Sequence, residues 1–304
     1  MSSKRGPTPQ PNLDGESRSA HEAESRRSER DSFWSSEAVS GSSERAEAYP
    51  VFVLGAARSG TTAVSVALKS ATRYRGFPEG HVLDVAIRLI DAVDGHFEKK
   101  DSWISPQASS IFQLGQVGHA SLRVEMIEVL RRLASGYTTP YWFDKTPTHQ
   151  MVASVPILAE AWPNARFIFM KRRGLENMCS WLRKFNRQDF AIGCQNWALA
   201  MSTWRMVRES VPHKFVELDQ HSLLEDAEES AAGVGRLLRL NALEVEAFAA
   251  ALRRARPEVT DPSARIFSDV SELGWPAERL NLFRDLCGAE MEAYGYTYDT
   301  EYCR

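Results

Sequence analysis

The stretch Val51-Phe-Val-Leu-Gly55-Ala-Ala-Arg58-Ser59-Gly60-Thr61-Thr62-Ala63 joins an apolar run to a glycine-bracketed segment and then to helix-forming residues. This order predicts a buried strand, a tight loop and the start of a helix. Gly55 and Gly60 permit backbone conformations and close approaches that a Cβ atom would block. The N–H groups of residues 57–62 can therefore converge on one anion beside a helix N-terminus. The stretch predicts a phosphate-binding loop.

The cation of this loop is an arginine inside it. In a Walker loop, G-x-x-x-x-G-K-[ST], a lysine reaches the β- and γ-phosphates and the next Ser or Thr holds Mg²⁺. Thr61 stands where that lysine would be, so a triphosphate–Mg²⁺ complex would lose its main counter-charge. Arg58 instead offers a planar fork of donors, which suits a tetrahedral oxyanion of lower charge. The loop favours a nucleotide other than a triphosphate.

A second apolar strand, turn and helix start occur mid-chain, in Arg166-Phe-Ile-Phe-Met-Lys-Arg172-Arg-Gly-Leu-Glu-Asn-Met-Cys-Ser180-Trp181. An arginine at the tip of a strand and a hydroxyl two turns into the next helix can converge on one phosphate. Arg172 and Ser180 have this relationship. The chain thus carries two anion motifs, in two strand–turn–helix units.

The two motifs resemble those of sulfotransferases that use 3′-phosphoadenosine 5′-phosphosulfate (PAPS). The pattern G-x-x-R-S-G-T-T after a strand is similar to the family's 5′-phosphosulfate loop, and the family's 3′-phosphate element has an arginine followed by a serine eight residues later. Many members have Asn-Pro or Asp-Gly after that arginine, whereas this chain has Arg173-Gly174. Either arginine is thus a candidate, and the spacing favours Arg172. The resemblance implies these nucleotide-binding residues: Arg58, Ser59, Gly60, Thr61, Thr62, Arg172 and Ser180.

The chemistry that the resemblance implies requires a base, because a hydroxyl that attacks sulfur must lose its proton. Glu79 and His81 follow a predicted strand at 74–77, which would place both beside the loop. In the branch that resembles Golgi and tyrosylprotein sulfotransferases, a glutamate occupies this place, whereas cytosolic aryl enzymes use a histidine further along. We therefore expect Glu79 to be the general base and His81 to be a helix-start or supporting residue.

The leaving group needs a cation, because cleavage of the S–O bond builds negative charge on the bridging oxygen. Lys145 lies in Asp144-Lys145-Thr146-Pro147 and resembles the lysine of the family's Asp-Lys-[Thr/Ser/Asp]-Pro segment near the sulfuryl group. The resemblance implies that Lys145 is catalytic. PAPS carries its sulfate already activated, so we expect no metal. The cysteines form no C-x-x-C pair and no ligand cluster: Cys179, Cys194, Cys287 and Cys303.

From Tyr49 onward, strand-like and helix-like segments alternate, which predicts an α/β fold with a mostly parallel sheet flanked by helices. The resemblance implies a P-loop-like sulfotransferase architecture, and both anion motifs fall at the carboxyl ends of strands. We expect one domain over residues 48–304. The predicted elements include strands at 50–54, 141–143, 166–170 and 214–219, helices at 63–70, 152–162 and 277–294, and a loop at 101–106.

Composition separates the first 47 residues from the rest. They are rich in Ser, Arg and Glu and have hardly any aliphatic residues, which predicts a disordered tail. The net charge of −3 argues against a nucleic-acid partner bound by bulk electrostatics. The chain has neither a secretory signal nor an apolar run of about 18 residues. We expect a cytoplasmic protein with no transmembrane segment.

The expected function is transfer of a sulfuryl group from PAPS to an acceptor hydroxyl by in-line displacement. The hydroxyl would belong to a small molecule, carbohydrate or lipid, and the sequence specifies neither its identity nor the oligomeric state. One alternative is a P-loop-type nucleotide kinase or NTPase, against which the missing Walker lysine argues. A second is a non-catalytic nucleotide-binding module, against which Glu79 and Lys145 argue.

Overall fold

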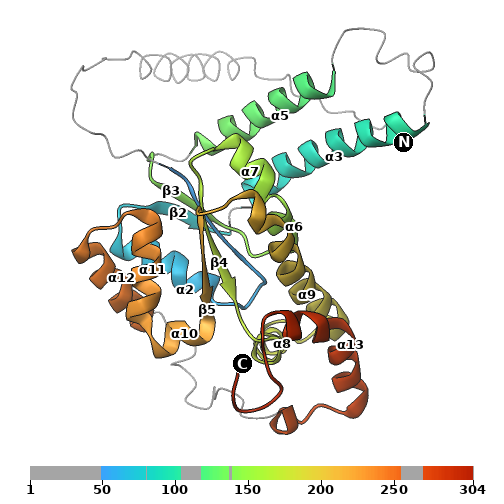
Figure 1. Cartoon of the computed structure of the whole chain (residues 1–304), viewed down its shortest axis with the longest axis vertical. Helices are drawn as coiled ribbons and strands as arrows, with labels where there is room; N and C mark the ends of the chain where they lie inside the picture. The colour runs from blue at the N-terminus through green and yellow to red at the C-terminus, as the bar shows by residue number, and fades with distance from the viewer. Residues whose placement is uncertain (1–48, 80, 104–117, 137–138, 255–269, 304) are drawn as a thin grey trace, which may run out of the picture. The chain divides into compact units, whose positions relative to one another are not determined.

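Five parallel strands form the central sheet of the computed structural model (Figure 1), in the order β2-β3-β1-β4-β5. The strands are β1 (Val51–Gly55), β2 (Arg75–Pro78), β3 (Trp142–Lys145), β4 (Arg166–Lys171) and β5 (Phe215–Asp219). Since every neighbouring pair is parallel, the α/β class with a parallel sheet is confirmed. The four strands predicted at 50–54, 141–143, 166–170 and 214–219 are present, each within two residues of the expected ends.

The register of the strands brings their carboxyl ends to one edge of the sheet. Gly55 lies opposite Met170, and Lys171 lies opposite Asp219. On the other side of β1, Lys145 lies opposite Val53. The residues that follow β1, β3, β4 and β5 therefore emerge close together, as ligand-binding loops do in open parallel sheets.

Successive side chains of a strand point to opposite faces, and β1 shows this directly. Val51 and Val53 pack in the core on one face, whereas Phe52 and Leu54 pack in the core on the other. The first face is covered by α2 (Thr61–Ala71), α10 (Gln220–Glu225), α11 (Ala227–Leu238) and α12 (Ala242–Arg254). The second core includes α3 (Val82–Trp103), α5 (His119–Ala134), α6 (His149–Ala153), α7 (Val155–Ala161), α8 (Gly174–Lys184), α9 (Phe190–Val207) and α13 (Ala277–Ala293).

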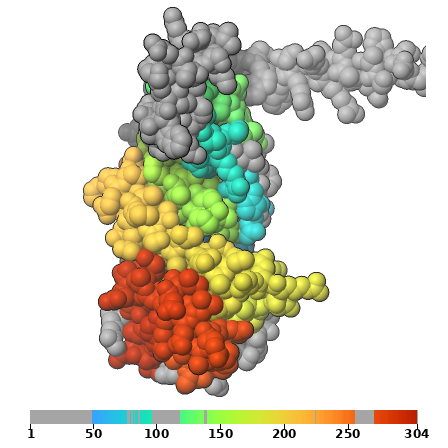
Figure 2. Space-filling view, turned by 90° about the vertical axis from the view of Figure 1, so that its right-hand side faces the viewer, coloured from blue at the N-terminus to red at the C-terminus, as the bar shows by residue number. Residues whose placement is uncertain are grey.

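The C-terminal helix α13 packs on α9, and Figure 2 shows the red C-terminal segment against the yellow one. The side chains of Cys287 on α13 and Cys194 on α9 are both buried in this contact. Two short 3₁₀ turns complete the described elements, η2 (Arg208–Ser210) and η3 (Val270–Leu273).

Two sequence predictions about helices were wrong. The predicted helix at 152–162 is two helices, α6 and α7, separated at Ser154. Pro156 lies in the first turn of α7, and because proline has no N–H and its ring clashes with the preceding turn, a helix cannot run through this point unbroken. The loop expected at 101–106 was wrong over its first three residues, because α3 continues to Trp103; residues 104–106 lie outside the described residues.

The structure describes residues 49–79, 81–103, 118–136, 139–254 and 270–303. The chain divides into two units, Met1–Ala46 and Glu47–Arg304, and all described residues belong to the second. The tail predicted over residues 1–47 lies outside the described residues. No helix in the described ranges has the length and apolar character needed to cross a membrane.

Candidate active site

The loop between β1 and α2 has an unusual backbone that its glycines permit. Gly55 has φ 141°, and a Cβ atom there would lie 2.4 Å from the carbonyl oxygen of Met170 on β4. Gly60 has φ 92° and precedes the first residue of α2. Arg58 also has a positive φ, 72°, which is uncommon for a residue with a side chain. The loop therefore turns sharply and leads directly to the N-terminus of α2, where the first N–H groups lack partners within the helix.

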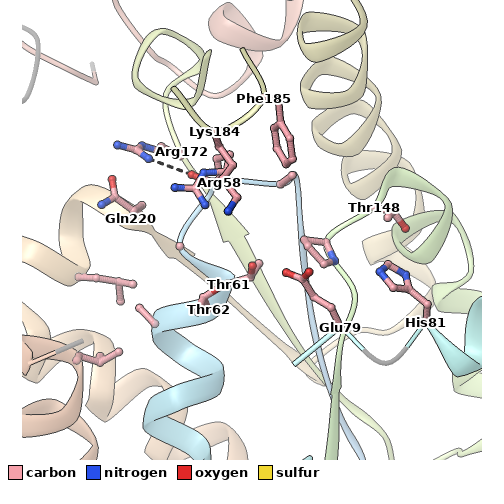
Figure 3. Close-up of a pocket in the computed structure, with 16 residues that line it drawn as sticks. Arg58, Thr61, Thr62, Glu79, His81, Thr148, Arg172, Lys184, Phe185 and Gln220 are labelled. Carbon is pink, nitrogen blue, oxygen red and sulfur yellow. Dashed lines mark hydrogen bonds between the residues drawn. The ribbon is translucent and has the colours of Figure 1, made fainter. Parts of the chain in front are cut away.

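This loop forms one wall of a cavity of about 330 Å³. Figure 3 shows Arg58, Arg172 and Gln220 toward one end of the cavity and Glu79, His81 and Thr148 toward the other. The remaining lining residues are Ala57, Gly60, Thr61, Thr62, Ala63, Pro147, Lys184, Phe185, Leu223 and Leu252. A cationic end and a carboxylate end therefore share one cavity, with the helix N-terminus between them.

Hydrogen bonds join the two anion motifs. The Nη1 atom of Arg172 donates to the carbonyl oxygen of Arg58 at 3.0 Å (Figure 3), and the Nε atom of Arg58 donates to Oγ of Ser180 at 3.1 Å. The motifs are more than 110 residues apart in sequence. The structure thus brings the tip of β4, the loop after β1 and the second turn of α8 to one place.

Glu79 and Lys145 come together because β2 and β3 are neighbours. Pro78 lies opposite Lys145, so Glu79 follows directly beyond this pair. The Nζ atom of Lys145 lies 2.5 Å from Oε1 of Glu79, and the backbone N–H of Glu79 donates to the carbonyl oxygen of Lys145 at 3.1 Å. The side chain of Lys145 is 1% exposed and that of Glu79 is 52% exposed. A buried ammonium therefore holds a carboxylate that faces the cavity.

The hydrogen bond from Lys145 lowers the pKa of Glu79, and it outweighs the effect of burial, which acts in the opposite direction. Electrostatic interactions with Lys145, His81 and Arg58 lower the pKa of Glu79 further. Glu79 is therefore a carboxylate at neutral pH, which is the form that can accept a proton.

The sequence matches the model of the sulfotransferase family over residues 50–244, a span that contains both anion motifs, Glu79 and Lys145. The chain belongs to the sulfotransferase family. No curated protein matches this sulfotransferase significantly.

The chain is similar to several solved sulfotransferase structures. Sulfotransferase STF9 from Mycobacterium avium is 15% identical, with a TM-score of 0.50 over 83% of this chain and 78% of that chain. STF1 from Mycobacterium tuberculosis H37Rv is 18% identical, with a TM-score of 0.44 over 79% of this chain and 78% of that one. The sulfotransferase domain from the curacin biosynthetic pathway is 16% identical, with a TM-score of 0.43 over 78% and 96% of the two chains. At 15% identity the likeness to STF9 concerns the fold alone.

Of the two adjacent arginines in the sulfotransferase motif, only Arg172 lines the cavity. The guanidinium of Arg173 is fully buried and faces the C-terminal segment. Its Nε atom donates to Glu176 at 2.8 Å, Nη2 also contacts that carboxylate, and Nη1 donates to the carbonyl oxygen of Asp299 at 2.7 Å. Arg172 is therefore the arginine of the pair that a ligand in the cavity could reach.

Ser59, Lys145 and Ser180 lie behind the cavity wall rather than on it. Ser180 contacts Arg58, and Lys145 contacts Glu79. Ser59 accepts a hydrogen bond from the side chain of Asn177 at 3.0 Å, and the same amide donates to the carbonyl oxygen of Ala57 at 3.0 Å. Asn177 was missed from the sequence. It lies three residues before Ser180 on α8, so helical periodicity would place it on the same face.

His81 lines the cavity beside Glu79, and its backbone also has a positive φ, 48°. Its Nδ1 atom lies 3.1 Å from Oδ2 of Asp84. The carboxylate of Asp84 therefore orients the imidazole. Its position directly before α3 and its contact with Asp84 suit a supporting residue rather than the base itself.

Other lining residues were missed by sequence reasoning. Lys184 follows Ser180 by one helical turn, so its position on the same helix face was predictable. Gln220 and Leu223 come from α10 and Leu252 from α12, and only the fold brings them to the loop. Among the described residues, no group of three or more His, Cys, Asp or Glu side chains is arranged to hold a metal ion.

Proposed function

We propose that this sulfotransferase moves the sulfuryl group of PAPS to an acceptor hydroxyl by direct in-line displacement. The observation that carries the proposal is the chain of contacts from Arg172 through Arg58 to Ser180 beside one cavity. PAPS carries anionic groups at both the 5′ and 3′ positions of one nucleoside, so it needs two anion sites close together. The joined motifs supply two such sites.

The loop is suited to the 5′-phosphosulfate. Gly60, Thr61 and Thr62 lie at the N-terminus of α2, which favours an anion through its N–H groups and its dipole. Arg172 lines the cavity and is suited to the 3′-phosphate; Ser180, behind the wall, contacts Arg58 and would reach the phosphate only from there. Ser59 supports the loop through Asn177.

In the transfer step, the acceptor oxygen forms a bond to sulfur as the bond between sulfur and the bridging oxygen breaks. Glu79 takes the proton of the acceptor hydroxyl, and adenosine 3′,5′-bisphosphate leaves with the electron pair of the broken bond. Lys145 stabilises the negative charge that develops on the leaving group. Since a bound sulfuryl group would compete for the ammonium of Lys145, donor binding would loosen its contact with Glu79 and free the carboxylate for the proton.

The acceptor is proposed to approach through a second cavity of about 290 Å³, which shares Ala57, Pro147, Thr148 and Phe185 with the first. Its other polar and aromatic lining residues are His149, Gln150, Asn177, Trp181, Gln188, Asn196 and Trp197. Burial lowers the pKa of His149, so its imidazole is uncharged at neutral pH. Uncharged hydrogen-bonding groups beside indole rings suit a neutral hydroxyl-rich acceptor such as a carbohydrate.

The test is transfer from ³⁵S-labelled PAPS to a panel that contains carbohydrates, lipids, phenols and tyrosine peptides, with the wild type and Glu79→Gln. We expect the Glu79→Gln protein to bind nucleotide normally and to transfer at least ~10²-fold more slowly, the low end for a lost general base. Glu125→Gln, on the exposed surface of α5, is the matched control and should keep wild-type activity.

Two results would contradict the proposal. Wild-type transfer rates in Glu79→Gln would remove this residue from the proton-transfer step. Tight binding of adenosine 3′,5′-bisphosphate without transfer to any member of the panel would favour a nucleotide-binding module without catalytic activity.

A further inference from the structure

Tyr302 occupies a conformation that needs support from its surroundings. Its side chain is buried at 7% exposure, and its backbone φ is 59°. A positive φ is a genuine outlier for a bulky residue, and such conformations persist where neighbouring contacts fix them. The adjacent Cys303 forms an antiparallel bridge with Tyr296, so the described C-terminal segment doubles back on itself here.

The hydroxyl of Tyr302 joins the ends of two strands. It accepts a hydrogen bond from the backbone N–H of Arg173, the second residue after β4, at 3.1 Å. It donates to Oδ1 of Asp219, the last residue of β5, at 2.7 Å. The guanidinium of Arg173 also lies 4.8 Å from the centre of the Tyr302 ring. One side chain thus contacts both strand ends.

Asp219 transmits this contact to α10. Its Oδ1 atom accepts from the backbone N–H of His221 at 2.9 Å and so caps the helix, while Oδ2 accepts from the hydroxyl of Tyr296 at 2.5 Å. The imidazole of His221 stacks on the Tyr302 ring, with 4.3 Å between ring centres. Tyr302 therefore contacts the start of α10 at two residues: the capping residue Asp219 and His221 in the first turn.

The two strand ends that Tyr302 joins each lead to a residue of the nucleotide cavity. Arg172 precedes Arg173, and Gln220 follows Asp219; both Arg172 and Gln220 line the cavity. Tyr302, Arg173 and Asp219 do not line it. Gln220 also lies beside the loop, since a Cβ atom added to Gly60 would be 3.1 Å from its Cγ atom.

We propose that Tyr302 is a positioning residue for nucleotide binding: its hydroxyl fixes the ends of β4 and β5 so that Arg172 and Gln220 face the same ligand. The identity of the ligand rests on the proposed function, whereas the link between the strand ends does not. Loss of the hydroxyl should weaken nucleotide binding and leave the transfer step alone, because Glu79 and Lys145 come from β2 and β3.

The experiment is calorimetric titration of the full chain with adenosine 3′,5′-bisphosphate, together with kcat at saturating PAPS. In Tyr302→Phe, which keeps the ring and removes the hydroxyl, we expect Kd to rise about 5- to 20-fold and kcat to stay within about 2-fold, as for the loss of a bridging hydroxyl with two hydrogen bonds. Tyr294→Phe is the matched control. Its hydroxyl donates to the carbonyl oxygen of Met201 on α9 at 2.9 Å, rather than to Arg173 or Asp219. It should lower Tm by a similar amount and leave Kd unchanged.

An unchanged Kd in Tyr302→Phe, or equal increases in Tyr302→Phe and Tyr294→Phe, would overturn the inference. If the wild type itself does not bind the bisphosphate, the proposed function fails instead. If Tyr302→Phe does not fold, Tyr296→Phe is the substitute, because the hydroxyl of Tyr296 also donates to Asp219. The inference then requires Kd to rise about 3-fold or more, with kcat unchanged. A wild-type Kd in that variant would contradict it.

Discussion

At the scale of single residues, the contact between Lys145 and Glu79 sets how far toward acid pH the proposed base stays ionised. The hydrogen bond from the buried ammonium lowers the pKa of the Glu79 carboxyl from its usual value of 4.5. A carboxyl with a lowered pKa stays ionised until the pH falls through that lowered value. We therefore expect kcat/KM to be flat through neutral pH and to fall on the acid side only below about 4.5.

Lys145→Met tests this assignment. Without the ammonium, the pKa of Glu79 should rise, so the acid limb of kcat/KM should move to higher pH, and the plateau rate should drop because the leaving group loses its cation. Lys69→Met, on the exposed end of α2, provides a control for loss of a lysine charge. An acid limb at the wild-type position in Lys145→Met would show that Glu79 is not the titrating base.

Substitution of His81 tests whether Glu79, rather than the neighbouring histidine, is the base. Because Asp84 orients its imidazole and Glu79 is the proposed base, His81→Asn should retain transfer within about 10-fold of wild type, below the range for a lost general base. The initial rate at saturating PAPS and acceptor measures this. A loss as large as that in Glu79→Gln would assign the proton to the histidine instead.

At the scale of elements, sequence patterns predicted strands better than helix interruptions. The apolar runs before the loop at 56–60 and before Arg172 are short and end at turn residues, so both strands were predictable. The break at Ser154 was missed because the apolar pattern continues across it, although Pro156 indicated it. The sequence also placed Glu79 near Lys145 only through the resemblance, whereas the pairing of β2 with β3 gives the physical reason.

Arg172 and Arg173 could not be told apart by residue type, and their difference is set by the strand end and the helix that follows. Arg173→Ala should destabilise the fold by about 3–5 kcal/mol, because it leaves the buried carboxylate of Glu176 without its partner. Arg172→Ala should destabilise the fold less, by about 1 kcal/mol for the lost hydrogen bond to the carbonyl oxygen of Arg58, and should weaken binding of adenosine 3′,5′-bisphosphate by about 2 kcal/mol. Chemical denaturation and calorimetry measure the two effects. The reverse pattern would assign the phosphate to Arg173.

At the scale of the whole molecule, the cavity depends on segments that no local pattern connects. Gln220, Leu223 and Leu252 carry no motif, and they reach the loop because β5 lies beside β4 and α12 packs on α2. For the same reason the contacts of Tyr302 with Arg173 and Asp219 could not be predicted from the sequence. The anion loops were predictable because each is a local strand–turn–helix unit.

Ligand binding should stabilise the whole fold in proportion to affinity. Adenosine 3′,5′-bisphosphate at 100 times its Kd should add about 2.7 kcal/mol to the free energy of unfolding, seen as a higher Tm. ATP with Mg²⁺ at the same concentration should stabilise less, because Thr61 replaces the Walker lysine. A larger Tm shift with ATP and Mg²⁺ would favour a nucleotide kinase or NTPase instead.

Transfer activity should persist in excess EDTA, because the proposed transfer step uses no metal ion.

On the proposed function, the loop after β1 and the tip of β4 hold opposite ends of one nucleotide. Titration of the wild type and Arg172→Ala with adenosine 3′,5′-bisphosphate and with adenosine 5′-monophosphate measures the part of the affinity that comes from the 3′-phosphate. We predict that the wild type binds the bisphosphate at least ~10-fold more tightly than the monophosphate, as for one charge-assisted phosphate contact, and that Arg172→Ala removes this preference. Equal affinities in the wild type, or a preference that survives in Arg172→Ala, would contradict the claim.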